Sequence, residues 1–134
     1  MESNQLNSRL ISLHQLHKDR QNGLQFIRNE VEKETGKTIS QLIIEYSETK
    51  RYDLALKLIT TSNKAVCEAM FIPVEAGTRY KAEFENSGLL VSSKDKFQCP
   101  YTGEMVHFLS TNPLEFDRLR KTNDTQLNLF SDEQ

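Results

Sequence analysis

Residues 62–90 read SNKAVCEAMFIPVEAGTRYKAEFENSGLL and contain two helix patterns joined by a tight turn. Ser62 or Asn63 suits the N-cap of the first helix, which the pattern predicts to continue to Met70. Four apolar side chains at helical spacing are predicted to face inward: Ala65, Val66, Ala69 and Met70. Phe71-Ile72 ends this helix, and Pro73 suits the first turn of the next one.

The second helix is predicted over residues 74–86 and is closed by Ser87-Gly88, because glycine readily adopts the left-handed conformation that ends a helix. The residues expected on its inner side are Val74, Gly77, Tyr80, Ala82 and Phe84, together with Leu89.

Helices are also predicted upstream of this stretch. Apolar residues recur in steps of four and three over residues 6–31, which favours one long or broken helix: Leu6, Leu10, Leu13, Leu24, Ile27 and Val31. Either this helix packs on its own domain, or it forms a homodimer through residues 6–31. Gly36 is expected at its C-terminus, a new helix begins at Thr38 or Ser40, and a further helix fits residues 52–59.

Downstream, the pattern changes to strands. Residues 89–91, 97–99 and 105–109 are predicted strands, with turns at residues 92–96 and 100–104. Pro113 interrupts this pattern, and residues 114–119 fit one or two helical turns. We therefore expect a mainly α fold with a small antiparallel β-hairpin, an α+β class, arranged as an N-terminal helical extension (1–36), a domain (37–120) and a disordered tail (121–134).

The order of three helices, a Phe84-Glu-Asn-Ser-Gly88-Leu89-Leu90 exit and a hairpin resembles the winged helix-turn-helix family of DNA-binding proteins. The resemblance covers residues 51–111. It implies that the third helix reads the major groove of double-stranded DNA and that the hairpin is a wing on the flanking backbone.

The resemblance implies a set of DNA-binding residues. Arg79 suits a guanine edge and Thr78 a phosphate or a thymine methyl, while Lys64 suits a phosphate at a helix N-terminus. The remaining candidates are Lys81 on the third helix and Lys94 and Lys96 in the predicted hairpin turn.

The net charge and the charges of the third helix favour a different class of protein, a non-enzymatic protein-interaction adaptor. The chain has a net charge of −2, and acidic residues share the third helix with Arg79 and Lys81. The pairs Glu75–Arg79 and Lys81–Glu85 therefore also fit a solvated helix surface. Clustering of the basic candidates on one face would favour DNA, and interruption of that face by Glu75, Glu68 and Glu83 would favour the adaptor.

The tail sequence Gln126-Leu127-Asn128-Leu129-Phe130 is similar to the pentapeptide by which bacterial replication and repair proteins dock on the sliding clamp. The similarity implies that Gln126, Leu127, Leu129 and Phe130 bind this partner, although Asn128 departs from the preferred central residue. The alternatives are that the apolar residues fold back onto the body or bind another partner.

Composition excludes several other classes. Cys67 and Cys99 are too few for a disulfide framework, and Cys99 with His107 does not make a four-ligand zinc site. No phosphate-binding loop, nucleophile–base pair, apolar membrane span or secretory signal is recognisable. We therefore expect no enzyme, cofactor or metal. The expectation is a bacterial, cytoplasmic accessory protein that acts in transcription regulation or DNA replication.

Overall fold

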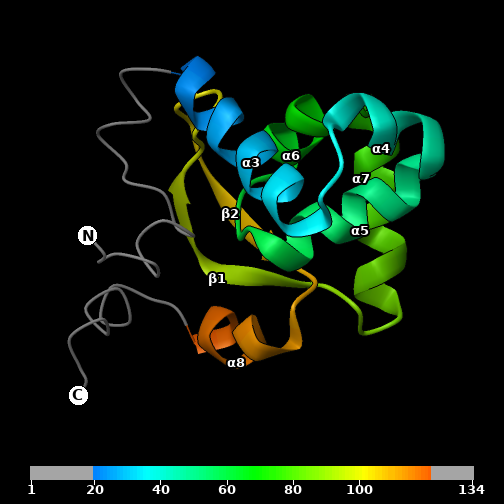
Figure 1. The fold of residues 1–134 in the computed structure, drawn as a ribbon. Coiled ribbons are helices and arrows are strands. Elements are labelled where there is room, and N and C mark those ends of the chain that lie inside the picture. Colours follow the sequence, from blue (N-terminus) through cyan, green and yellow to red (C-terminus); the bar gives the residue numbers. More distant parts are fainter. Residues whose placement is uncertain (1–19, 122–134) are drawn as a thin grey trace.

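The computed structural model describes residues 20–121, which form six helices and one antiparallel hairpin (Figure 1). The mainly α, α+β class expected from the sequence is therefore confirmed. The elements in chain order are α3 (Arg20–Thr35), α4 (Ile39–Glu45), α5 (Glu48–Leu58), α6 (Asn63–Met70), α7 (Val74–Asn86), β1 (Val91–Gln98), β2 (Met105–Ser110) and α8 (Pro113–Lys121). None of the helices in this part of the chain is long and apolar enough to span a membrane.

The main core lies among the helices, and α3 belongs to it. Leu24, Ile27 and Val31 of α3 are at most 2 % exposed and join one buried cluster with residues of α5 and α6. The apolar stripe predicted over residues 6–31 is therefore covered, from Leu24 onward, by the chain's own domain. Leu6, Leu10 and Leu13, which would complete a homodimer seam, lie outside the described residues.

A second, smaller apolar layer lies between the hairpin and α8. Val91, Phe97, Phe108 and Leu119 are buried but do not belong to the main cluster. The rings of Phe97 and Phe108 are 5.2 Å apart between centroids, and α8 packs on β1. Figure 1 shows the hairpin between the helical body and α8. Both faces of the hairpin are therefore covered for part of their length.

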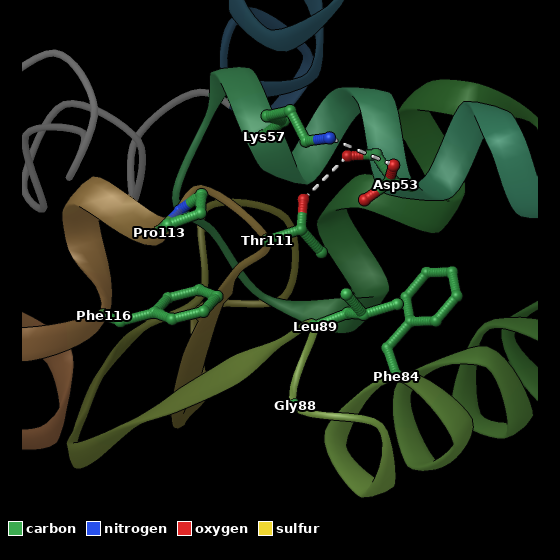
Figure 2. Close-up of a pocket in the computed structure, with 8 residues that line it drawn as sticks. All are labelled: Asp53, Lys57, Phe84, Gly88, Leu89, Thr111, Pro113 and Phe116. Atoms are coloured by element: carbon green, nitrogen blue, oxygen red, sulfur yellow. Dashed lines mark hydrogen bonds and ion pairs between the residues drawn. The ribbon is translucent and has the colours of Figure 1, made fainter.

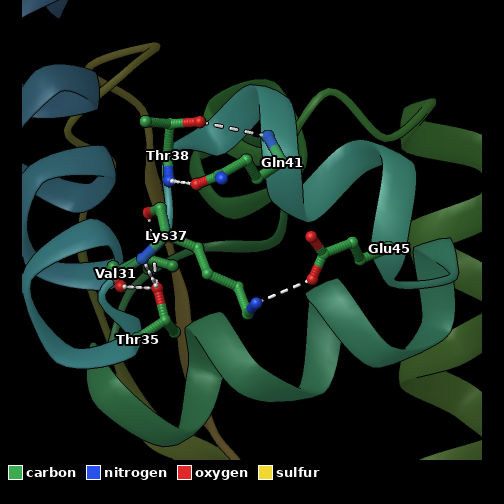
Figure 3. A network of polar contacts seen from close by, with 6 residues as sticks. All are labelled: Val31, Thr35, Lys37, Thr38, Gln41 and Glu45. Atoms are coloured by element: carbon green, nitrogen blue, oxygen red, sulfur yellow. Dashed lines mark hydrogen bonds and ion pairs between the residues drawn. The ribbon is translucent and has the colours of Figure 1, made fainter.

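The ends of several helices follow from local side chains. Gly36 ends α3 with a φ of +71°, and its amide donates to the Glu32 carbonyl at 2.8 Å. Thr38 caps α4 in a reciprocal arrangement, because its hydroxyl accepts from the Gln41 amide while the Gln41 side chain accepts from the Thr38 amide (Figure 3). Each of these ends was expected from the sequence.

An ion pair closes the same corner of the fold. Lys37 Nζ lies 2.7 Å from Glu45 Oε1 at the opposite end of α4 (Figure 3). The hydrogen bond that Lys37 donates to Glu45, followed by the negative charge of Glu45, raises the pKa of Lys37. The pair is solvent-exposed, so it contributes little to stability and mainly fixes the α3–α4 loop.

The exit from α7 has the geometry of a Schellman motif. Gly88 has a φ of +77°, its amide donates to the Glu85 carbonyl at 3.1 Å, and the Leu89 amide donates to the Phe84 carbonyl at 2.8 Å. This explains the spacing Phe-x-x-x-Gly-Leu, because the motif places the apolar side chains at its two ends beside each other. The predicted closure of α7 at Ser87-Gly88 is confirmed.

The prediction of a turn at residues 92–96 is wrong. β1 continues through this segment, with an irregularity between Ser92 and Lys96, so the hairpin has two strands rather than three. The Ser93 hydroxyl accepts from the Phe108 amide at 2.9 Å and donates to the Asp95 carbonyl at 2.6 Å. This side chain replaces a missing bond between the strands, and the segment bulges instead of reversing. The hairpin turn lies at residues 99–104.

Candidate nucleic-acid interface

Residues 71–73 connect α6 to α7 and are called the joint below. The joint contains one residue of unusual backbone conformation. Phe71 ends α6 with a φ of +59°, the only positive φ of a non-glycine residue between positions 20 and 121. This conformation costs a residue with a side chain about 1–2 kcal/mol. Its persistence requires stabilising contacts around the joint.

Two arginines supply those contacts. Arg51, which is 5 % exposed, donates from Nε to the Met70 carbonyl at 3.2 Å and from its terminal nitrogens to the carbonyls of Tyr46 and Phe71 at 2.9 and 3.4 Å. Arg28 Nε donates to the Ala69 carbonyl at 2.9 Å, and the guanidinium lies 4.8 Å from the centroid of the Phe71 ring. Positive charge at the C-terminus of a helix also opposes the negative end of its dipole.

The crossing of α6 and α7 depends on Gly77. A methyl group at this position would stand 2.2 Å from Cys67 Sγ, 3.1 Å from Asn63 Oδ1 and 3.3 Å from Tyr52 Cε1. The absence of a side chain therefore allows α7 to lie directly on α6. Burial raises the pKa of Cys67 to about 12 and raises that of Tyr52 as well, so both side chains are neutral inside this contact.

The exposed strip of α7 faces away from this contact. It consists of Glu75, Thr78, Arg79, Ala82, Glu83 and Asn86. Ala82 was predicted on the inner side and is exposed, whereas Ala76 is 5 % exposed and takes the inner position beside Gly77. The prediction of Leu89 as an inner residue is also wrong, since 56 % of its surface is exposed.

The strip continues onto the N-terminus of α6 and the hairpin turn. Asn63 Nδ2 donates to Thr78 Oγ1 at 3.4 Å, which joins α6 to α7. Lys64 Nζ lies 3.9 Å from Glu104 Oε1 in the hairpin turn. Ser62, the cap of α6, bonds through its hydroxyl to Cys99 Sγ at 2.9 Å. The predicted residues Lys64 and Thr78 therefore belong to one continuous surface.

The remaining predicted residues are distributed differently. Arg79 is exposed, with its guanidinium 6.0 Å from the centroid of Tyr80. Lys81 is half-buried and pairs with Glu85 at 3.1 Å, and Glu85 also accepts from the Ser92 hydroxyl. Lys94 and Lys96 are exposed on β1 rather than in the hairpin turn, since that turn lies farther along the chain.

The charges of this surface are mixed. Glu75 and Glu83 flank Arg79 by one helical turn on each side, and Glu104 pairs with Lys64. Among residues 20–121, Arg79, Lys94 and Lys96 are not in an ion pair with a carboxylate. The acidic interruption that would favour an adaptor is thus present on α7, where Arg79 is the single cation of the exposed strip.

The structure also adds residues that sequence reasoning missed. Arg51 and Arg28 were not predicted to hold the joint, because their partners lie 19 to 41 positions away in the sequence. The tail residues Gln126, Leu127, Leu129 and Phe130 lie outside the described part of the chain. Within that part, no group of three or more His, Cys, Asp or Glu residues could hold a metal ion.

The chain matches no protein-family model, no curated protein and no solved structure.

Proposed function

We propose that this chain is a winged-helix module that binds double-stranded DNA through the exposed strip of α7. The order of the elements carries this proposal. Helix α5 is followed by a single bridging residue, Thr61, then by α6, α7 and the hairpin. Thr61 and Leu109 exchange both backbone hydrogen bonds, at 2.8 and 3.3 Å, so an isolated bridge joins the segment between α5 and α6 to the hairpin.

The joint supports the placement of α7 as a reading helix. Arg51 and Gly77 fix its direction and its closeness to α6, and the face opposite Gly77 is exposed over about three helical turns. A recognition helix needs this combination, because one face must be held rigidly while the other enters the major groove. Arg79 is the candidate for a guanine edge and Thr78 for a phosphate or a thymine methyl.

Phosphate contacts are proposed for the surrounding cations. Lys64 lies in the first turn of α6, where free backbone amides also attract anions, and Lys94 and Lys96 are exposed on β1. Lys81 is a weaker candidate for a phosphate contact, because Glu85 already neutralises its charge. The overall negative charge does not oppose this assignment, because residues 20–121 contain 15 Lys and Arg against 14 Asp and Glu.

The test is a titration of fluorescent duplex DNA at two salt concentrations. Arg79→Ala is expected to weaken binding about 5- to 100-fold, and Lys94→Ala and Lys96→Ala are each expected to lower the salt dependence by about one phosphate contact. Lys33→Ala, which removes an exposed cation from α3, is the matched control and should leave affinity unchanged. Failure of the parent chain to bind at low salt would refute the proposal.

The second candidate is a protein-interaction adaptor, and the mixed charge of α7 favours it. Glu75 and Glu83 would repel phosphates, whereas a protein partner could pair with them. The variant Glu75→Gln separates the two functions. It should strengthen DNA binding by removing a repulsive charge, and it should weaken a protein complex in which Glu75 pairs with a cation.

The similarity of the tail to clamp-binding peptides supports a further part of the proposal, that the DNA-binding module is recruited to the bacterial replication clamp. An accessory role in DNA replication or transcription regulation, in the cytoplasm, would follow. Fluorescence anisotropy with purified sliding clamp tests this. The double variant Leu129→Ala/Phe130→Ala should lose binding, and equal binding of parent and variant would exclude these residues as the docking peptide.

A further inference from the structure

A pocket of about 220 Å³ opens where the end of α7 meets the start of α8 (Figure 2). Figure 2 shows Phe116 and Pro113 on one side and Leu89 and Phe84 on the other, with Thr111 between them. The pocket does not include the α7 strip proposed for DNA. It therefore calls for its own explanation.

The local backbone structure at the end of α7 determines the exposed apolar wall of this pocket. The Schellman motif at Gly88 fixes Leu89 beside Phe84, and 56 % of the Leu89 surface stays exposed as a result. Phe84 and Phe116 are only half-buried. On a small surface, three such side chains around one hollow indicate a place for an apolar ligand side chain.

The rim of the pocket is polar and firmly held. Thr111 Oγ1 donates to the Asp53 carbonyl at 2.8 Å, and Lys57 Nζ lies 3.4 Å from Asp53 Oδ2 (Figure 2). Half of the Lys57 side chain is exposed. A ligand with apolar side chains would match the wall, while the Lys57–Asp53 pair leaves the rim close to neutral.

We propose that the pocket receives the chain's own C-terminal motif, with Leu129 and Phe130 inserted between Leu89 and Phe116. Acidic residues flank the motif on both sides, because residues 122–134 contain Asp124, Asp132 and Glu133 but neither Lys nor Arg. These charges suit the last turn of α8, where Lys121 is exposed and pairs with no carboxylate among residues 20–121, whereas Arg118 and Arg120 already pair with Glu115 and Asp117.

The segment between α8 and the motif is long enough to bring the motif back to the pocket. α8 has nine residues from Pro113 at the pocket to Lys121, a distance of about 12 Å. The four residues 122–125 span about 13 Å when extended, so they can run back along α8 and bring the motif to the pocket. A short tether of this kind gives an effective concentration in the millimolar range, which allows even a weak contact to form.

Occupation of the pocket by the motif does not depend on DNA binding by α7. It concerns which surface the motif occupies in the free chain, and it implies that any outside receptor for the motif must compete with the pocket. The proposal therefore stands or falls separately from the function proposed for α7.

The absence of tryptophan from the chain allows a direct test. In Phe130→Trp the single indole reports the surroundings of the motif. We expect blue-shifted emission and protection from acrylamide quenching, and both should be lost in guanidinium. Adding Leu89→Lys or Phe116→Ala should raise quenching several-fold, while Leu114→Lys should not change it. Leu114 is the matched control because it lies on α8, is 88 % exposed and does not line the pocket.

Three results would overturn the proposal. One is an indole that is fully quenched in the folded parent chain, which would leave the pocket empty. Another is protection that survives both pocket variants, which would place the motif on a different surface. The third is protection that disappears on dilution, which would mean that the motif occupies the pocket of a second copy. Circular dichroism of each variant establishes that its fold is retained.

Discussion

Replacing Gly77 with alanine tests the packing that orients α7. The added methyl group would lie 2.2 Å from Cys67 Sγ, whereas uncompressed contacts between such atoms need about 3.5–4 Å. The two helices would have to separate by more than an ångström, or Cys67 would have to change rotamer against Tyr52 and Asn63, the other two contacts of this position. Overpacking of this kind typically costs about 1–3 kcal/mol.

One term acts in the opposite direction. Alanine is favoured over glycine in the interior of a helix by about 0.5–1 kcal/mol, so the expected net loss is about 1–2 kcal/mol. For a domain of this size such a loss lowers the melting temperature by about 5–15 °C. Urea denaturation followed by far-UV circular dichroism measures the free energy directly.

A double-mutant cycle isolates the contact. Cys67→Ala removes the sulfur that the new methyl group would meet, so Cys67→Ala/Gly77→Ala should be more stable than the sum of the two single changes predicts, by about 0.5–3 kcal/mol. Glu83→Ala, an exposed position on the same helix, is the control and should change stability by less than about 0.5 kcal/mol. If Gly77→Ala is as stable as the parent chain, close approach at this position does not determine the helix crossing.

Three further predictions concern other parts of the fold. Arg51→Met should cost about 3–5 kcal/mol, because three backbone carbonyls lose their buried donor, and Arg51→Lys should recover only part of this; urea denaturation measures both. Gly88→Ala should cost about 1–2 kcal/mol and Gly88→Asn less, since a methyl group there meets no atom within 4 Å and only the φ of +77° is strained; equal stability of all three would contradict this. The free energy of unfolding should fall as pH rises above 9.0 toward about 12, because the unfolded chain releases the Cys67 proton first, and Cys67→Ala should remove that part of the alkaline slope.

The features that could be predicted from the sequence are those set by neighbouring residues. Thr38 with Gln41 and Gly88 with Leu89 end helices through contacts within a few positions, so their spacing is visible in the sequence. The amphipathic spacing of α6 is equally local, and the four residues predicted to face inward are buried: Ala65, Val66, Ala69 and Met70. Helix order and the class of fold follow from such signals.

Distant contacts explain what could not be predicted. Ser-Ser-Lys-Asp-Lys at residues 92–96 suits a turn and a bulge equally well, and the choice is made by the Phe108 amide across the hairpin. The joint depends on Arg51 and Met70, which are 19 positions apart, and Lys64 meets Glu104 only after folding. These contacts of the candidate site could therefore not be predicted from a single sequence.

The bond between Ser62 and Cys99 has a mechanical consequence. A hairpin attached only at its base can bend at its turn independently of the body, and this one is tied to α6 at its turn as well. The hairpin turn and the start of α6 should therefore move together, because any displacement of the turn must also displace the first residues of α6. A ligand that pushes on the turn would thus apply a force to the helix beneath α7, and amide hydrogens of the turn should exchange as slowly as those of the neighbouring helix.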